Sequence, residues 1–456
     1  MVYTPNTGKD RRHMMEKLGV ASVEELFANI PSSVRLKGDI DLPKALSEIE
    51  LTRHMYSLGK KNRNLEDDIV CFIGAGAYDH FIPSVVSHIS ARSEFYTAYT
   101  PYQPELSQGT LQAMFEYQTF ICKITGMYTS NASLYDGATA VVEAANMSIA
   151  FTKRKKVVIS SLVHPEYRTV LDTYASAGDF EVVGTQYSEG KTDISQIQEV
   201  VDENTACVIV QNPNFLGSIE DLSRISEVAH AKGALFVVSM YPISSGLLKL
   251  PGDCGADIVV GEGQSLGIPI SFGGPYLGIF ACSERLRRYM PGRVTGITSD
   301  ANGRRGYVLT LQTREQHIRR EKATSNICSN EALCALSACV YIASLGKKGL
   351  KQVAELCVCK AHYLSSEIAD IKGLSLKFNT AFFNEFVIKV EKASKKGLKY
   401  IEKLNRELLK RNILSGLPLG RIYPELSDCI LFCVTEKRSK EQMDSLVKAL
   451  KQLISD

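Results

Sequence analysis

Six short apolar runs alternate with helical patterns between residues 66 and 325, and this alternation constrains the fold more than any other feature of the chain. The runs are rich in β-branched residues and almost uninterrupted in apolar character. They lie at residues 156–160, 180–183, 206–210, 235–238, 256–260 and 276–280. Such runs are typical of strands buried on both faces, as in a parallel sheet covered by helices. The sequence therefore predicts an α/β fold with a mostly parallel central sheet.

The residue patterns divide the chain into three parts. Residues 1–65 are polar and helix-rich, which predicts an N-terminal helical arm. Residues 66–325 form the predicted large domain, and residues 326–456 form a predicted small C-terminal α/β domain. In and next to this small domain we expect helices at 331–345, 396–411 and from 440 onward, and strands at 383–390 and 429–434. Ser439 and Gln442 have the spacing of a capping box at the start of the last helix.

Composition excludes several classes of protein. The chain has 456 residues, of which 45% are apolar and 23% charged, as in ordinary globular proteins. A formal net charge of +3 provides no broad field to attract nucleic acid or an anionic membrane. No stretch approaches the roughly 20 apolar residues of a membrane span, and the first residues lack the apolar segment of a signal peptide, so we expect a cytoplasmic protein. The 12 cysteines lack zinc-type spacing, and we expect buried thiols and no metal.

A glycine pair and a small-residue loop are candidate ligand sites. Gly74 and Gly76 could belong to a dinucleotide-binding turn, but Asp79 stands where the third glycine is needed, which favours an ordinary turn. The loop at 131–140 leads into a helix, whose free N–H groups suit an anion. Alternatively, this is a capped helix that starts at Ser133 or Asp136.

Two further segments combine aromatic, polar and charged residues. Residues 96–105 hold three tyrosines and two prolines, which favour a recognition surface, although a buried loop would look the same. Residues 313–322 are densely charged, and their Arg and His side chains could bind a carboxylate or phosphate or form ion pairs at an interface. The basic run at 153–156 lies between a helix and a strand, which indicates solvated surface.

Several literal stretches of the chain closely resemble one protein family. They are YTAYTPYQPE at 96–105, NASLYDGATA at 131–140, QNPNFLG at 211–217, GEGQSLGIPISFGGP at 261–275 and REQHIRREKATSNIC at 314–328. The resemblance is to the glycine cleavage system P-protein family, in its N-terminal subunit branch, glycine dehydrogenase (decarboxylating) subunit 1. It implies a large domain with the pyridoxal-phosphate-dependent transferase fold, the aspartate aminotransferase fold of type I.

The residue expected to attach the cofactor is absent. In the family, the catalytic half carries pyridoxal phosphate on a lysine preceded by histidine, and this pair falls on Gln264 and Ser265. An aldimine needs a primary amine, which neither residue has. The strand at 235–239 also lacks the acid that usually pairs with the pyridinium nitrogen. The resemblance therefore implies that this chain binds no pyridoxal phosphate covalently and that a partner subunit carries it.

The resemblance also implies a function and a set of partners. The intact enzyme decarboxylates glycine and transfers the aminomethyl group to the lipoyl group of H-protein. We expect this chain to be the subunit without cofactor, joined to a homologous subunit 2 in an α2β2 heterotetramer. The residues expected to support the active site or the interface are Tyr99, Thr100, Tyr102, Gln103, Ser133, Tyr135, Asp136, His317 and Arg319. The alternatives are a separate pyridoxal enzyme that uses Lys249 or Lys322, and a scaffold without catalytic partner.

Overall fold

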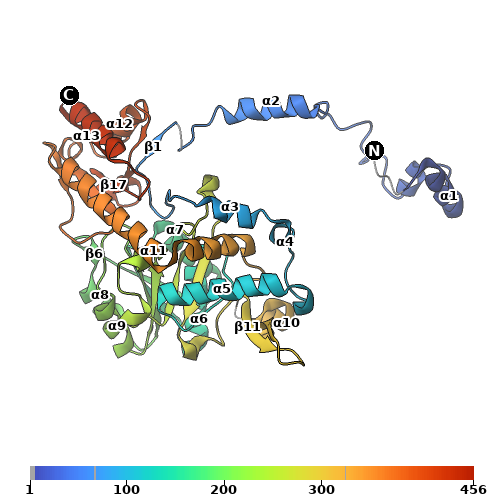
Figure 1. Ribbon diagram of the computed structural model, residues 1–456, viewed down its shortest axis with the longest axis horizontal. Helices are drawn as coiled ribbons and strands as arrows, with labels where there is room; N and C mark the ends of the chain where they lie inside the picture. Colours follow the sequence, from blue (N-terminus) through green and yellow to red (C-terminus); the bar gives the residue numbers. More distant parts are fainter. Residues whose placement is uncertain (1–5, 66–67, 324, 456) are drawn as a thin grey trace. The chain divides into compact units, whose positions relative to one another are not determined.

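The structure is a computed structural model, and it describes residues 6–65, 68–323 and 325–455 (Figure 1). The chain forms two compact units, one that reaches to Arg63 and one that begins at Asn64. The first unit contains helices, and the second contains both helices and sheets.

In the first unit, residues 6–63 form short helices, and none of these residues is buried. The helices are α1 (Gly8–Leu18), η1 (Val23–Phe27) and α2 (Glu48–Gly59). Thr7 and Ser47 begin α1 and α2 with reciprocal capping boxes, and none of the helical residues is buried. The helix-rich character predicted for this segment is confirmed.

The second unit is organised around a sheet of seven strands in the order β2-β10-β9-β8-β7-β3-β4. The strands from β9 to β4 are parallel, whereas β10 and β2 are antiparallel to their neighbours. The strand bounds are β2 Thr129–Ser130, β3 Lys156–Ser160, β4 Glu181–Thr185, β7 Thr205–Asn212, β8 Leu235–Met240, β9 Ile258–Glu262 and β10 Gly278–Cys282. All six predicted runs are strands. β9 and β10 each start two residues later than predicted, at Ile258 and Gly278.

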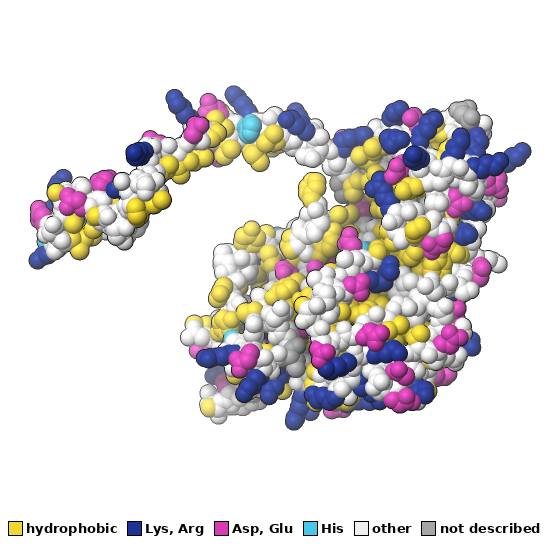
Figure 2. All heavy atoms as spheres, turned by 180° about the vertical axis from the view of Figure 1, so that it is seen from behind, with side chains coloured by type: hydrophobic (Ala, Val, Ile, Leu, Met, Phe, Trp, Pro, Cys, Tyr) yellow, Lys and Arg dark blue, Asp and Glu magenta, His cyan; other side chains and the backbone are white. Residues whose placement is uncertain are grey.

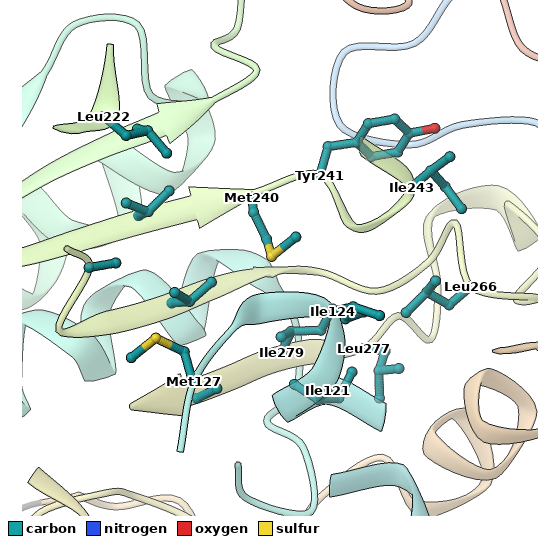
Figure 3. Close-up of a cluster of buried hydrophobic side chains, with 14 of the residues drawn as sticks. Ile121, Ile124, Met127, Leu222, Met240, Tyr241, Ile243, Leu266, Leu277 and Ile279 are labelled. Carbon is teal, nitrogen blue, oxygen red and sulfur yellow. The ribbon is translucent and has the colours of Figure 1, made fainter. Parts of the chain in front are cut away.

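Helices cover both faces of this sheet, as continuous apolar strands require. Alternate residues of β7 and β8 point to opposite faces, so that Val208 packs in one cluster and Cys207 in the other. The covering helices are α5 (Gln108–Thr125), α8 (Ile194–Val200) and α9 (Leu222–Ala231) on one face, with α6 (Gly137–Thr152) and α7 (Pro165–Ala177) on the other. Figure 3 shows Ile121 and Ile124 of α5 packed beside Ile279 of β10.

The helix α11 (Ala332–Ala369) connects the central sheet with a second, smaller sheet. It is interrupted at Gly346, whose φ is 59°. Before this point α11 packs beside α5, and after it Leu364 and Ile368 lie in the core of the smaller sheet (Figure 1). Among the described residues, α11 alone is long and apolar enough to cross a membrane by length and composition. Its burial in two protein cores is typical of an interior helix.

The smaller sheet is antiparallel, with the strand order β13-β14-β17-β16. Its strands are β13 Leu374–Leu376, β14 Glu385–Val390, β16 Leu417–Pro418 and β17 Cys429–Cys433, and the helices α12 (Leu398–Leu409) and α13 (Lys440–Ser455) pack on it. The predicted capping box is confirmed, since the backbone amides of Ser439 and Gln442 each donate to the other's side chain, at 3.0 and 3.2 Å. The boundary at residue 325 stays a prediction, because both sheets lie in one compact unit.

Positive and negative side chains are interspersed on the face of the molecule shown in Figure 2. In the basic run at 153–156, three of the four cationic side chains contact oxygen atoms of the chain. Lys155 pairs with Asp179, and Lys156 donates to Asp202 at 3.1 Å. Arg154 donates to two backbone carbonyls. These cations are therefore bound by the protein's own oxygens, in agreement with the surface interpretation.

Candidate functional site

Three features that the sequence connects with a cofactor converge at the carboxyl ends of β8 and β9. They are the N-terminus of α6, Ser239 and Gln264. Ser239 lines a cavity of about 20 Å³ at this edge of the sheet, together with Gly76, Tyr78, His164, Tyr167, Gln211, Met240, Tyr241 and Glu262. A water molecule needs about 10–15 Å³ of such volume. The cavity therefore has room for about one water and for no larger group.

The carboxylate of Glu262 occupies the N-terminus of α6. Its Oε2 accepts a hydrogen bond from the amide of Gly137 at 2.9 Å, and its Oε1 accepts from the amides of Gln264 and Leu277, each at 3.0 Å. Burial raises the pKa of Glu262 to about 7, while the three amide donors act in the opposite direction. The anion position that the sequence predicts at this helix is thus filled by the chain's own carboxylate.

Asp136 begins α6, as one of the two predicted caps. Its Oδ1 accepts from the amide of Thr139 at 2.8 Å, and the Thr139 hydroxyl accepts from the Asp136 amide at 3.2 Å. Ser133, the other candidate cap, does not start the helix, because its hydroxyl accepts from the amide of Glu331 at 3.1 Å. Ser133 therefore connects the loop before α6 with the start of α11.

An aromatic pair fills the space beside the helix terminus. The rings of His164 and Tyr167 are stacked with centroids 4.6 Å apart and an interplanar angle of 29°. A Cβ placed on Gly137 would lie 2.5 Å from the Tyr167 hydroxyl, so the phenol reaches the first turn of α6. His164 Nε2 lies 2.8 Å from the carbonyl of Ala75, and burial lowers the pKa of this histidine. The Gly74 to Gly76 segment is a turn, as the sequence favours.

Gln264 has a structural role at the position where the family resemblance expects the cofactor amine. Its side chain accepts from the amide of Tyr78 at 2.8 Å and donates to the carbonyls of Tyr78 and Ile268 at 3.1 and 2.8 Å. The neighbouring Ser265 hydroxyl is buried and has no hydrogen-bond partner. Lys249 and Lys322 are both exposed and do not line the cavity.

A second cluster joins several of the predicted residues around Arg293. The guanidinium of Arg293 donates to the Tyr102 hydroxyl at 3.4 Å and to the Cys328 carbonyl at 2.7 Å. The amide of Cys328 donates to the Tyr135 hydroxyl at 3.4 Å. The ring of His317 meets that of Tyr102 edge-on at 6.4 Å. Tyr102, Tyr135 and His317 are therefore brought together through a residue, Arg293, that the sequence did not single out.

The other predicted residues lie at the surface. Tyr99, 84% exposed, and Thr100 line an open cavity next to this cluster. Gln103 and Arg319 are exposed, and no side-chain hydrogen bond is formed by either among the described residues. The structure thus brings Tyr102, Tyr135 and His317 together around Arg293, whereas Tyr99, Thr100, Gln103 and Arg319 lie at the surface outside this cluster and Ser133 and Asp136 belong to the loop and helix start before α6.

Among the described residues, one set of side chains lies close enough to share a metal ion: His80, Cys357 and Glu436, with ligand atoms within 4.8 Å. His80 Nδ1 is 2.6 Å from the Glu436 carboxylate, and its Nε2 contacts the hydroxyl of Tyr241. The Cys357 thiol donates to the same carboxylate at 3.6 Å. These groups satisfy one another as a hydrogen-bonded network, and we assign no metal to them.

Sequence reasoning missed Glu262, Tyr167, His164 and Arg293. Two of them carry a signal in the sequence. Glu262 is an acid at the end of an apolar strand, and His164 follows β3 at the same edge of the sheet, where open α/β folds bind ligands. Tyr167 and Arg293 carry no such signal, because their roles depend on neighbours that are distant in sequence.

Replacement of Glu262 by Gln should destabilise the fold. Above the pKa of about 7, both carboxylate oxygens accept hydrogen bonds, whereas the amide nitrogen of Gln would face one of the donating amides. We expect a loss of about 1–3 kcal/mol in the free energy of unfolding, measured by urea denaturation. The control is Glu284→Gln, at an exposed glutamate, which should change stability by less than about 0.5 kcal/mol. Equal stability of the two variants would contradict the assigned role of Glu262.

Comparisons with known proteins agree with the resemblance seen in the sequence. The family model described as glycine cleavage system P-protein matches residues 1–450. The chain is 56% identical over 450 residues to the probable glycine dehydrogenase (decarboxylating) subunit 1 of Desulforamulus reducens, with 99% of each chain covered. A crystal structure of glycine decarboxylase (P-protein) of the glycine cleavage system, in inhibitor-bound form, superposes with a TM-score of 0.90 at 43% identity, covering 99% of this chain and 100% of that one.

A more distant structure shows the fold alone. Sphingosine-1-phosphate lyase of Burkholderia pseudomallei superposes with a TM-score of 0.66 at 15% identity, covering 93% of this chain and 94% of that chain. The structural neighbours are pyridoxal-phosphate-dependent enzymes of fold type I, and the predicted fold class is therefore confirmed.

Proposed function

Since the chain belongs to the glycine cleavage system P-protein family, we propose that it is the subunit of a heteromeric glycine decarboxylase that holds no pyridoxal phosphate. The enzyme decarboxylates glycine and transfers the aminomethyl group to the lipoyl group of H-protein. In this assembly a homologous subunit 2 supplies the lysine and the cofactor. We expect an α2β2 heterotetramer in the cytoplasm.

The observation that carries the proposal is the filled cavity at the carboxyl ends of β8 and β9. Pyridoxal phosphate needs an anion site for its phosphate, a flat slot for its ring and an amine for its aldehyde. Here Glu262 fills the anion site, Tyr167 stacks on His164, and Gln264 is held by three hydrogen bonds. The remaining 20 Å³ or so does not fit the cofactor.

The separate pyridoxal enzyme that uses Lys249 or Lys322 finds no support in this geometry. Both lysines are exposed, and neither lines the cavity that the family resemblance connects with the cofactor.

We assign Tyr99, Thr100, Tyr102, Gln103 and Arg319 to the contact with subunit 2. Tyr99, Thr100 and Tyr102 present aromatic rings and hydroxyls at the surface, which is the chemistry of a recognition site. Gln103 and Arg319 lie exposed in the two segments that form this surface. We assign a supporting role to Ser133, Tyr135 and Asp136, which accept hydrogen bonds from the amides of Glu331, Cys328 and Thr139. His317 is exposed, and its ring meets that of Tyr102.

Reconstitution from separate subunits tests the proposal. The purified chain alone should show no absorption of a pyridoxal aldimine, no cofactor trapped by borohydride, and no glycine decarboxylation. Mixing with the lysine-bearing subunit and lipoylated H-protein should produce activity that neither subunit has alone. The measurement is release of CO2 from carboxyl-labelled glycine at a series of subunit ratios.

Two outcomes would contradict the proposal. A yellow chain with borohydride-trapped cofactor would indicate a separate pyridoxal enzyme. Full activity of the lysine-bearing subunit without this chain would indicate a scaffold. A variant of the lysine-bearing subunit without its cofactor lysine is the matched control, and it should give no activity in the mixture.

A further inference from the structure

The side chain of Phe272 is 97% exposed, more than any other large apolar side chain among the described residues. It belongs to a short turn, η5 (Ser271–Gly273), in the loop 269–275 between Gln264 and β10. Single exposed apolar side chains are ordinary on protein surfaces, so exposure alone assigns no role to Phe272. Its backbone conformation, the composition of the loop and the position of the loop distinguish it from such residues.

The loop holds Phe272 in an unfavourable backbone conformation. The φ of Ser271 is 46° and that of Phe272 is 56°, in the left-handed region that residues with a Cβ rarely adopt. The two residues that follow, Gly273 and Gly274, also have positive φ, of 108° and 148°. Such strain persists only where the surrounding structure imposes it, and it is concentrated at functional sites.

Three hydrogen bonds fix the base of the loop. The Tyr276 hydroxyl donates to the carbonyl of Ile270 at 3.0 Å. The side chain of Gln264 donates to the carbonyl of Ile268 at 2.8 Å, and the Ile268 amide donates to the Gln264 carbonyl at 3.1 Å. Among the described residues, nothing lies within 4 Å of a Cβ placed on Gly273, so the tip projects from this base. The tip is therefore held in place before a partner arrives, which lowers the entropy lost on binding.

The loop carries no charged side chain. Between Glu262 and Glu284 the sequence has no Asp, Glu, Lys, Arg or His, although charged residues make up 23% of the chain. An anionic membrane or a nucleic acid would need cations beside the aromatic ring, and the loop supplies none. A neutral tip with an aromatic ring is instead typical of the centre of a protein–protein interface, where aromatic residues are enriched and charged residues are depleted.

The loop is connected to the surface assigned to the contact with subunit 2. It leads into Gly278, which pairs with Leu134 through two backbone hydrogen bonds, of 2.8 and 3.1 Å. The neighbouring Ser133 hydroxyl accepts from the last amide before α11 at 3.1 Å. The start of α11 in turn lines one cavity with Tyr99 and Thr100. The loop and the Tyr99 segment are therefore connected through the residues that precede α6.

We propose that Phe272 anchors the contact with subunit 2 and that its ring inserts into an apolar pocket of that subunit. This role rests on the proposed function, and it adds a central apolar residue to the contact assigned to Tyr99 and Thr100. A projecting tip needs a concave partner surface, so it favours a contact between unlike surfaces over the pairing of two copies of this loop about a two-fold axis. Because the base of the loop is bound to Gln264, the anchor holds subunit 2 beside the edge of the sheet where β9 ends.

Calorimetric titration of the purified full chain with the lysine-bearing subunit tests this role. Phe272→Ala should weaken the affinity by about thirtyfold or more, as for a central interface residue. It should leave the urea midpoint of the chain alone unchanged, because the ring is exposed. Phe272→Leu keeps an apolar side chain and should recover part of the lost affinity. The matched control is Tyr128→Ala, at a 60% exposed tyrosine beyond the far end of α5, and it should leave the affinity unchanged.

Binding by the wild-type chain distinguishes this role from the proposed function. A wild-type chain that does not bind subunit 2 would overturn the proposed function and the anchor with it. Equal binding by wild type and Phe272→Ala would overturn the anchor alone. A photoreactive benzophenone analogue of phenylalanine at position 272, in a mixture with subunit 2 and H-protein, identifies the contact directly. Crosslinking to subunit 2 is the expected result, whereas crosslinking only to H-protein or to a second copy of this chain would overturn the role.

Discussion

Replacement of Gln264 by Lys should destabilise the protein by about 3 kcal/mol or more and should not create a pyridoxal phosphate site. The side chain of Gln264 is 2% exposed and both accepts from and donates to the backbone of Tyr78. An ammonium group cannot accept a hydrogen bond, so the amide of Tyr78 would lose its partner and a charge would be buried. Urea denaturation measures the stability, and borohydride trapping after incubation with pyridoxal phosphate measures cofactor attachment.

The adjacent residue provides a matched control. The Ser265 hydroxyl is buried without a hydrogen-bond partner, so Ser265→Ala removes an unsatisfied group. We expect a change within about 0.5 kcal/mol, or a small gain in stability. A stable Gln264→Lys variant with trapped cofactor would show that the cavity is not filled in the way described.

Replacement of Gly217 by Ala should be among the most damaging single changes in the chain. Gly217 has φ of 88°, and an added Cβ would lie closer than 3.0 Å to the backbone carbonyl of Glu385, a separation that real Cβ atoms essentially never show. The amide of Phe383 donates to the Gly217 carbonyl at 3.2 Å. The loop that contains Gly217 therefore cannot move away from the start of β14 without losing this hydrogen bond. We expect a loss of about 3–5 kcal/mol, measured by chemical denaturation.

Gly303→Ala separates the two causes of this effect. Gly303 also has a positive φ, of 76°, but nothing lies within 4 Å of an added Cβ. Its replacement should cost only the backbone penalty, about 1 kcal/mol. Similar losses in both variants would mean that the close approach to Glu385 is unimportant.

The role of the QNPNFLG segment at residues 211–217 could not be recognised from its motif alone. Its position after a buried strand suits either a ligand site or a tight turn. In the structure, Asn214 accepts from the amides of Leu216 and Ser218 and donates to Glu220. The amide of Phe383 donates to the Gly217 carbonyl, and Ser218 forms a bridge with Phe382, so the segment joins the end of β7 to the chain just before β14. This role could not be predicted because these residues lie far apart in the sequence.

The predicted site residues also divide into those whose role follows from the local sequence and those whose role depends on distant residues. Asp136 as a helix cap follows from local sequence, because a cap bonds to the next turn of its own helix. The contact of Tyr102 with Arg293, and that of Glu262 with Gly137, join residues separated by more than a hundred positions. No periodicity or motif in the sequence encodes such pairs.

By itself the sequence determined the strand and helix pattern, the family resemblance, and the absence of a lysine between Lys249 and Lys322. These are local properties, because periodicity, helix caps and a missing lysine can be recognised without knowing which residues are neighbours in space. Only the tertiary structure decided which side chains surround Gln264. The space around Gln264 depends on which side chains from distant parts of the sequence pack there. In the folded chain, Glu262 accepts from the Gln264 amide and Tyr167 packs against Gly137.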